Sequence, residues 1–325
     1  MKILVTGAAG FVGFHLVLNL LNLKHRVVGI DNINSYYSKN YKKYRINILK
    51  KKKNFNFIKL DLKNRSDLIK LFSKFKPDIV FHLASQPGIM YSFKNPKSYI
   101  SNNITATKNL MKISYRNNVK KFYFTSSSSV YGNKLKYPIK ETDSLKPLNT
   151  YAKTKKECEK ILQNFFRKTE VDLKIFRPFT VYGTYSRPDM IFITYLKKSH
   201  DNKKFYLFNN GNYVRDFTYI DDLCDILTKF IKVNKIKKNI INICSSNPIK
   251  ITKIISLIDK YNKKKTFVVK KPYRKGEMKK TYGDNKLLKK QISFESFTDI
   301  EIGIKKTVKW YKNFKNKKIL DFKKF

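Results

Sequence analysis

Residues 2–13 read KILVTGAAGFVG, a short apolar run that leads into a turn with three glycines. The run Lys2–Thr6 predicts a β-strand, and the apolar residues of Phe11–Leu23 recur at helical spacing. A glycine-rich turn between a strand and a helix lets a phosphate approach the backbone at the helix N-terminus, where N–H groups point outward. Residues 2–13 therefore predict a dinucleotide site.

The first half of the chain repeats this alternation of strand and helix. Apolar, β-rich runs predict five further strands, at Arg26–Asp31, Phe55–Asp61, Asp78–His82, Lys121–Ser126 and Asp172–Arg177. Helical spacing predicts two long helices, at Pro96–Asn117 and Tyr151–Thr169. Repeated βα units with apolar strands are typical of a parallel sheet covered on both faces. We therefore predict an α/β fold with a doubly wound Rossmann sheet.

The pattern becomes less regular after Pro178. Short strand-like pieces mix here with helical segments, at residues 205–208, 214–219, 221–233, 251–261 and 300–313. Residues 239–243 are a candidate return to the sheet. We predict a NAD-binding domain over residues 1–180 with returns near 217–243, and a smaller, interleaved substrate-binding lobe over most of 181–325.

The net charge of +48 first suggests a nucleic-acid-binding protein. Only nine of the 71 basic residues are arginines, however, and asparagine, isoleucine and tyrosine are also abundant. This bias indicates a drift in base composition that places lysine at solvated positions, so we do not expect nucleic acid as a partner. Where lysine suffices lysine is used, so each remaining arginine indicates a need for the planar guanidinium.

The three cysteines, Cys158, Cys224 and Cys244, are far apart and form neither a metal-binding pattern nor a disulfide framework. A reducing compartment fits this usage, and we expect a cytoplasmic protein without a metal site. The N-terminus has no signal-peptide pattern, and no apolar run approaches 18 residues. We therefore expect no membrane span.

The ends of three predicted strands supply candidate cofactor contacts. Asp31 closes the second strand, where its carboxylate can accept hydrogen bonds from the adenosine ribose. Its charge would repel a 2′-phosphate, which favours NAD over NADP. The next two strand ends are expected to contact the adenine and the length of the cofactor, through Asp61 and Leu62 and through Leu83, Ala84 and Ser85.

Tyr151 and Lys155 stand four residues apart at the start of a predicted helix, so both lie on one face of it. A nearby ammonium and a cationic nicotinamide favour the phenolate form of Tyr151. Tyr151 is therefore a candidate general base toward a sugar hydroxyl, and Lys155 a candidate contact of the nicotinamide ribose. The serine run Ser126–Ser129, after the fifth strand, supplies a hydroxyl that can share a proton with Tyr151.

With these motifs the chain resembles the extended short-chain dehydrogenases that act on nucleotide sugars, the NAD-dependent epimerase/dehydratase family. The resemblance rests on residues 7–13, 31–32, 82–85, 126–132, 151–155, 177–183 and 215–222. It implies Ser127 as the catalytic hydroxyl beside Tyr151 and Lys155. It implies that the cofactor contacts are Gly7, Gly10, Phe11, Val12, Gly13, Asp31, Asn32, Asp61, Leu62, Leu83, Ala84, Ser85, Asn102, Tyr151, Lys155, Pro178 and Val181.

Within the family, three serines indicate the reaction. Dehydratases carry Thr-Asp-Glu where this chain has Ser127-Ser128-Ser129, so the acidic pair needed to eliminate water is missing. Decarboxylating relatives usually have an acidic residue at the position of Ser129. UDP-glucuronate 4-epimerases are the members that this chain resembles most, through residues 31–37, 86–92 and 187–190. The resemblance implies NAD-dependent epimerisation at C4 of a UDP-sugar, and UDP-glucuronate as the substrate.

The substrate contacts that we expect have two functions. Short polar donors hold the sugar carboxylate, and an arginine-rich set grips the nucleotide: Gln86, Ser128, Ser129, Thr180, Arg187, Arg215, Arg274 and Glu277. Relatives dimerise through two helices per subunit, here Pro96–Asn117 and Tyr151–Thr169, which implies a homodimer. The alternatives are an epimerase for a neutral UDP-hexose, a decarboxylase or dehydratase, and a non-catalytic polyanion-binding protein on the same fold.

Overall fold

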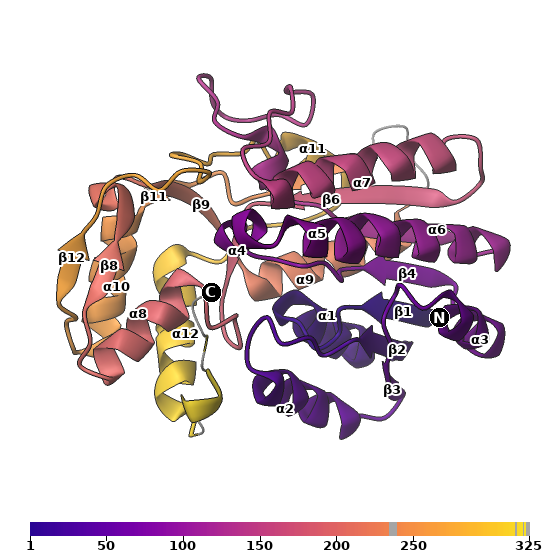
Figure 1. Ribbon diagram of the computed structural model, residues 1–325, viewed down its shortest axis with the longest axis horizontal. Helices are drawn as coiled ribbons and strands as arrows, with labels where there is room; N and C mark the ends of the chain where they lie inside the picture. Colours follow the sequence, from indigo (N-terminus) through magenta and orange to yellow (C-terminus); the bar gives the residue numbers. More distant parts are fainter. Residues whose placement is uncertain (234–238, 316, 321, 323–325) are drawn as a thin grey trace.

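The computed structural model describes residues 1–233, 239–315, 317–320 and 322 (Figure 1). Its centre is a seven-stranded parallel sheet with the order β10-β6-β5-β4-β1-β2-β3. The strands are β1 (Lys2–Thr6), β2 (Arg26–Asp31), β3 (Phe55–Lys59), β4 (Ile79–His82), β5 (Lys121–Thr125), β6 (Asp172–Pro178) and β10 (Ile240–Ile243). The order reverses between β1 and β4, which is the switch point where doubly wound sheets bind ligands. The predicted fold class is confirmed.

Two groups of helices cover the two faces of this sheet (Figure 1). One face packs against α1 (Phe11–Asn22), α2 (Lys39–Lys50) and α9 (Ile220–Lys229). The other packs against α3 (Arg65–Phe75), α6 (Ala106–Arg116) and α7 (Thr150–Phe166). Neighbouring residues of β1 divide between the faces, because Ile3 and Val5 join one core cluster and Leu4 the other. Both faces are therefore apolar, as the uninterrupted hydrophobic strands predicted.

The helix expected at Pro96–Asn117 consists of three consecutive segments. α5 (Pro96–Tyr99) is followed by a π-helical turn over Ile100–Thr105 and then by α6. Asn95 caps α5 through a hydrogen bond of 3.2 Å from the Ser98 N–H, with Pro96 at the first helical position. Such π-turns are frequent at functional sites, and this one carries Asn102.

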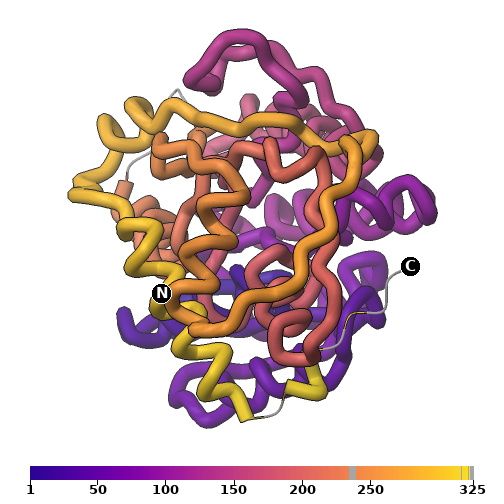
Figure 2. Tube along the Cα trace, turned by 90° about the vertical axis from the view of Figure 1, so that its left-hand side faces the viewer, coloured from indigo at the N-terminus to yellow at the C-terminus, as the bar shows by residue number. Residues whose placement is uncertain are grey.

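A smaller lobe lies beside the carboxyl ends of the central strands (Figures 1 and 2). It contains two small sheets, ordered β11-β9-β7 and β12-β8, and three helices that pack together. Its strands are β7 (Thr180–Tyr182), β8 (Phe205–Leu207), β9 (Val214–Tyr219), β11 (Pro248–Lys250) and β12 (Val268–Lys270). Its helices are α8 (Ile191–His200), α10 (Ile251–Asn262) and α12 (Ile300–Asn313). The division into two domains stays a prediction.

Several elements have no counterpart among the segments expected from the sequence. They are the helices α2, α3, α8, α4 (Ile89–Lys94) and α11 (Lys286–Gln291) and the three-residue strands β7, β11 and β12. The return expected at residues 239–243 is β10, which pairs with β6. Among the described residues, no helix is both long and apolar enough to cross a membrane.

Candidate functional site

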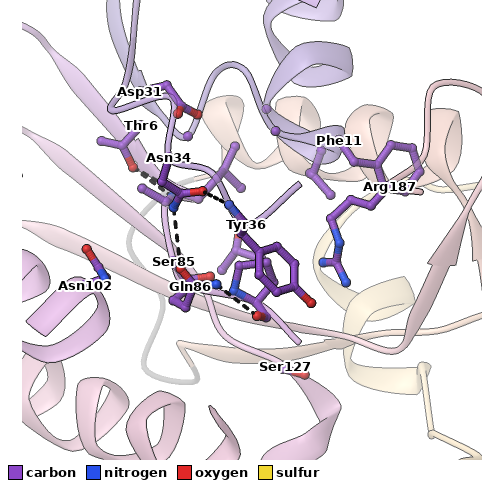
Figure 3. A pocket seen from close by; sticks show the side chains of 18 of the residues that line it. Thr6, Phe11, Asp31, Asn34, Tyr36, Ser85, Gln86, Asn102, Ser127 and Arg187 are labelled. Atoms are coloured by element: carbon purple, nitrogen blue, oxygen red, sulfur yellow. Dashed lines mark hydrogen bonds between the residues drawn. The ribbon is translucent and has the colours of Figure 1, made fainter. Parts of the chain in front are cut away.

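A cavity opens at the carboxyl ends of β1, β2, β4 and β5, on the side of the smaller lobe. Every residue predicted to bind the cofactor lines this cavity. Of the predicted substrate contacts, Gln86, Thr180 and Arg187 line it as well. Asn102 and Arg187 reach it from opposite sides, and Ser127 lies between them at its lower edge (Figure 3).

The glycine turn between β1 and α1 leaves no room for a side chain at Gly7 or at Gly13. Gly7 has a φ of 72°, and a Cβ there would lie 2.9 Å from the backbone nitrogen of Ala84. A Cβ on Gly13 would lie 2.1 Å from the carbonyl oxygen of Gly7. Gly7 thus allows the turn, and Gly13 allows α1 to pack directly against it.

The start of α1 suits an anionic group. Its N-cap is Gly10, and no side chain caps the helix. The uncapped N–H groups and the positive end of the helix dipole therefore face the cavity, where they favour a phosphate. The Asp31 carboxylate accepts hydrogen bonds from the Ala9 N–H at 3.2 Å and the Ile33 N–H at 2.8 Å. This arrangement fits the pyrophosphate and adenosine ribose of a dinucleotide.

Polar groups that follow β2 and β3, together with the π-turn, form another part of the cavity wall. Asn32 donates a hydrogen bond of 3.1 Å to the Asp61 carboxylate, whose other oxygen accepts from the Lys63 N–H at 2.9 Å. The Asn102 amide donates a hydrogen bond of 2.8 Å to the Ser98 carbonyl. These bonds hold Asp61 and Asn102 at the cavity wall, while the roles predicted for them stay predictions.

Tyr151, Lys155 and Ser127 all line the cavity. Burial raises the pKa of the Tyr151 phenol, whereas a hydrogen bond with the Ser127 hydroxyl and the charge of Arg187 lower it. Burial lowers the pKa of Lys155 to about 8, against the opposing effect of Cys158 and Glu159. The Lys155 ammonium donates a hydrogen bond of 2.7 Å to the Thr125 carbonyl. The structure thus brings together the three groups that the sequence predicted as a catalytic set.

A buried ion pair holds the serine run that follows β5. The Arg177 guanidinium binds both carboxylate oxygens of Glu159, at 2.9 and 2.6 Å, and each side chain is only 2% exposed. The same carboxylate accepts a hydrogen bond from the Ser126 hydroxyl. Since Glu159 lies on α7 two turns after Tyr151, the pair joins α7, β6 and the serine run.

Ser128 and Ser129, which we expected to contact the sugar, are not among the residues that line the cavity. Both are 6% exposed and lie in a short 3-10 turn over Ser128–Tyr131, capped by Ser127. The Ser129 hydroxyl donates a hydrogen bond of 2.9 Å to the Ser127 hydroxyl. Ser129 therefore orients Ser127 here, and the substrate contacts predicted for Ser128 and Ser129 stay predictions.

Arg187 extends into the cavity from the segment after β7 (Figure 3). Its guanidinium binds the Asp189 carboxylate through two hydrogen bonds of 2.9 Å. The Tyr36 hydroxyl donates a hydrogen bond of 3.2 Å to the same carboxylate. Asp189 therefore fixes the direction of the Arg187 guanidinium, and Arg187 still lines the cavity. This geometry is suited to bind an anion.

Arg215, Arg274 and Glu277 lie together around Tyr213, outside the cavity lining. Arg274 forms an ion pair with Glu277, and its guanidinium carbon lies 4.2 Å from the centre of the Phe208 ring. Arg215 lies 4.7 Å from the centre of the Tyr213 ring. The structure thus groups the three residues predicted to grip the nucleotide, but their contact with it stays a prediction.

Several residues that line the cavity were not among the contacts predicted from the sequence. Lys42 is the most informative, because its ammonium donates to the Asn34 side chain at 2.7 Å and to the Asn34 carbonyl at 3.0 Å. Burial lowers the pKa of Lys42 to about 8, and Asp31 opposes this shift. One lysine among so many carried no sequence signal. The others include Thr6, Tyr36, Tyr37, Phe179 and Met190.

Comparison with known proteins agrees with this geometry. Residues 3–244 match the model of the NAD-dependent epimerase/dehydratase family. A UDP-glucuronate 4-epimerase of Thermodesulfobacterium geofontis is 35% identical over 310 residues, which are 95% of each chain. The crystal structure of a UDP-glucuronic acid 4-epimerase from Bacillus cereus with UDP-glucuronic acid and NAD is 34% identical, has a TM-score of 0.90, and matches 97% of this chain and 100% of that one.

A UDP-glucose 4-epimerase of Thermotoga maritima with UDP-glucose is also similar. It is 27% identical, has a TM-score of 0.89, and is matched over 97% of this chain and 99% of that one. An epimerase named for an acidic sugar and one named for a neutral sugar are thus both similar to this chain over nearly its whole length.

Proposed function

This chain belongs to the NAD-dependent epimerase/dehydratase family and is a nucleotide-sugar epimerase with NAD as its cofactor, and we propose that it interconverts UDP-glucuronate and UDP-galacturonate. The observation that carries the proposal is the position of Arg187, which faces the cavity that Tyr151 and Ser127 line. The Arg187 guanidinium binds Asp189 through Nε and one terminal nitrogen, and we propose that its other terminal nitrogen binds the anionic group of the sugar.

The reaction begins with Tyr151 as a general base. NAD accepts a hydride from C4 of the sugar and returns it to the other face of the same carbon. Tyr151 removes the proton of the C4 hydroxyl as that hydride leaves, and it gives the proton back when the ketone is reduced. The Ser127 hydroxyl donates a hydrogen bond to the C4 oxygen, and the Lys155 ammonium stabilises the phenolate form of Tyr151.

The 4-keto intermediate of a glucuronosyl group is a β-keto acid, which loses carbon dioxide easily. The enzyme must therefore hold the carboxylate so that its C–C bond does not overlap the ketone π-system. Thr180 and Arg187 are the polar groups proposed for this task, because both line the cavity on the side of the smaller lobe. Ser128 assists if the serine turn opens toward the substrate.

Epimerisation also requires that the 4-keto sugar rotate and present its other face to the cofactor while the nucleotide stays bound. Arg215, Arg274 and Glu277 are proposed to hold the nucleotide, with the backbone of Phe205–Leu207 at the uracil. The Arg215 guanidinium lies over the ring of Tyr213, and the Arg274 guanidinium lies over the ring of Phe208. Two arginines in this region suit a diphosphate, because arginine binds phosphate through two parallel hydrogen bonds.

We further propose that two copies of the chain form a dimer through α6 and α7. The outer surface of these helices carries partly exposed apolar side chains, among them Tyr115, which is 48% exposed and has its ring 5.5 Å from that of Phe165. Ile100, at the start of the π-turn, is 52% exposed. Pairing of the two helices with their copies would remove this apolar surface from water.

The test is proton NMR of the products from UDP-glucuronate, UDP-glucose and UDP-N-acetylglucosamine, each given separately to the purified protein. We expect conversion of UDP-glucuronate to UDP-galacturonate, and none by the variant Tyr151→Phe. Turnover of the neutral sugars alone would assign the chain to the neutral-hexose epimerases. Retention on nucleic acid at moderate salt, with no turnover of any sugar, would favour the polyanion-binding alternative.

A further inference from the structure

The segment Thr184–Ser186 leads from β7 to Arg187 in an unfavourable backbone conformation. Tyr185 has a φ of 52°, which is the left-handed region that side chains other than glycine rarely adopt. This conformation costs about 1–2 kcal/mol in an L-residue. The Tyr185 ring nevertheless packs against Phe14 and Trp310, at centroid distances of 4.9 and 5.0 Å. The surrounding structure must therefore hold this segment firmly.

Three consecutive carbonyl groups of this segment are bound by side chains from the Rossmann helices. His15 on α1 donates from Nε2 to the Thr184 carbonyl at 2.9 Å. Burial lowers the pKa of His15 to about 4, so the ring is neutral at pH 7 and Nε2 carries its one proton. Two side chains of α2 bind the next two carbonyls.

The main contribution from α2 comes from Arg45, whose side chain is fully buried. One terminal nitrogen of its guanidinium donates to the Tyr185 carbonyl at 2.5 Å and to the Ser186 carbonyl at 3.3 Å. The Tyr41 hydroxyl also donates to the Ser186 carbonyl, at 3.3 Å. The guanidinium carbon lies 4.1 Å from the centre of the Tyr41 ring.

The other terminal nitrogen of Arg45 points to the cofactor side. It donates to the Ala9 carbonyl at 3.0 Å and to the Tyr37 hydroxyl at 2.7 Å. Ala9 lies in the glycine turn, and its N–H is bound by the Asp31 carboxylate. One guanidinium thus joins the phosphate-binding turn to the segment that ends at Arg187.

Arg45 makes these contacts without a carboxylate partner. Among the described residues no acidic side chain forms an ion pair with it, and its Nε atom has no hydrogen-bond partner there. A buried cation without a counter-ion is costly, and an apolar residue of the same size would be cheaper if only packing mattered. Its contacts are to carbonyls and a hydroxyl from different segments of the chain. This indicates that Arg45 holds these segments in position relative to each other.

We propose that Arg45 is a positioning residue that fixes the backbone from which Arg187 extends, by binding the carbonyls of Tyr185 and Ser186 and joining them to the glycine turn. Arg187 follows Ser186 directly, so the peptide that Arg45 orients sets where the Arg187 side chain begins. Arg45 is not among the residues that line the cavity, so it acts on the substrate through Arg187. The inference rests on the proposed function, since it takes UDP-glucuronate as the anion that Arg187 binds.

A double-mutant cycle tests this role. Dissociation constants for UDP-glucuronate are measured by calorimetry on NAD-loaded protein in the Tyr151→Phe background, where the ligand is not converted. Arg187→Met should weaken binding about thirtyfold, because it removes a charged hydrogen-bond donor. Arg45→Met should weaken it about tenfold when Arg187 is present, and less than about twofold when Arg187 is already Met.

The matched control is Arg26→Met. Arg26 is exposed at the start of β2, with its guanidinium carbon 6.0 Å from the centre of the Phe75 ring, and is not among the residues that line the cavity. This control should bind UDP-glucuronate like the parent. If Arg45 serves only the stability of the fold, its substitution weakens binding by the same factor whether residue 187 is Arg or Met. That additive result would overturn the inference.

A second variant covers the case in which Arg45→Met does not fold. Tyr41→Phe removes one of the two donors to the Ser186 carbonyl and leaves the ring stacked on Arg45. It should weaken binding about threefold with Arg187 present and have no further effect without it. Additive effects here would also overturn the inference. If the parent protein bound no UDP-glucuronate at all, the proposed function would fail, and this inference with it.

Discussion

Removing the charge of Glu159 should destabilise the protein strongly, although Glu159 lies outside the cavity lining. In Glu159→Gln the shape is preserved, but the Arg177 guanidinium stays buried with no carboxylate. Both side chains are 2% exposed and are joined by hydrogen bonds of 2.9 and 2.6 Å, so solvent does not replace the lost partner. Breaking such a pair on one side costs about 3–5 kcal/mol.

The expected change in melting temperature follows from the size of the chain. For 325 residues the unfolding entropy is about 0.7 kcal/mol/K, so 3–5 kcal/mol corresponds to a Tm lower by about 4–7 °C. Differential scanning calorimetry of the NAD-loaded protein measures this change. Replacing both members, as in Glu159→Leu with Arg177→Met, should recover most of the loss, since no buried charge is left.

The exposed pair between Lys260 and Glu301 provides the control. Their side chains are 62% and 39% exposed, so Glu301→Gln should leave the Tm unchanged within error. The reasoning is refuted if Glu159→Gln lowers the Tm by no more than this control, or if the double replacement is worse than the single one. Activity should fall in Glu159→Gln as well, because the same carboxylate holds Ser126 beside Ser127.

Three further predictions concern the cavity. Asp31→Asn should reduce the preference for NAD over NADP about five- to tenfold, because the charge that repels a 2′-phosphate is removed. Cofactor titration of the NAD-free protein measures this preference. An unchanged preference would contradict the role of Asp31. The pKa of Lys155 is lowered to about 8 by burial, so in NAD-free protein the unfolded chain holds this proton more tightly than the folded one. Stability relative to Lys155→Met should therefore rise by about 3 kcal/mol as the pH increases from 8 to 10.5, and a flat difference in urea denaturation would rule this out. Thr180→Ala should increase the share of decarboxylated 4-keto-pentose among the products from UDP-glucuronate, by NMR, whereas an unchanged share would show that Thr180 does not hold the carboxylate.

The sequence was sufficient where local chemistry determines the structure. The glycine turn needs positive φ and contacts closer than a Cβ allows, so its residues could be identified without any knowledge of the fold. Tyr151 and Lys155 share a helix face by spacing alone. The strands of the central sheet were predicted because their residues are apolar on both faces.

The sequence was insufficient where long-range contacts decide. Helix α2 has few apolar residues and many lysines, and it is held by the buried side chains of Tyr41, Arg45 and Leu49. A fully buried arginine bound to backbone carbonyls leaves no local pattern. The same holds for Ser129, whose hydroxyl turns to Ser127 instead of to the cavity.

The central claim is that one carbon of the sugar is oxidised and then reduced on its other face by the same cofactor molecule. UDP-glucuronate deuterated at C4 tests it most directly, with the product examined by NMR and mass spectrometry after reaction in ordinary water. The account predicts UDP-galacturonate that retains the deuterium at C4. Loss of the label to solvent, or a product that has lost its carboxyl group, would contradict it.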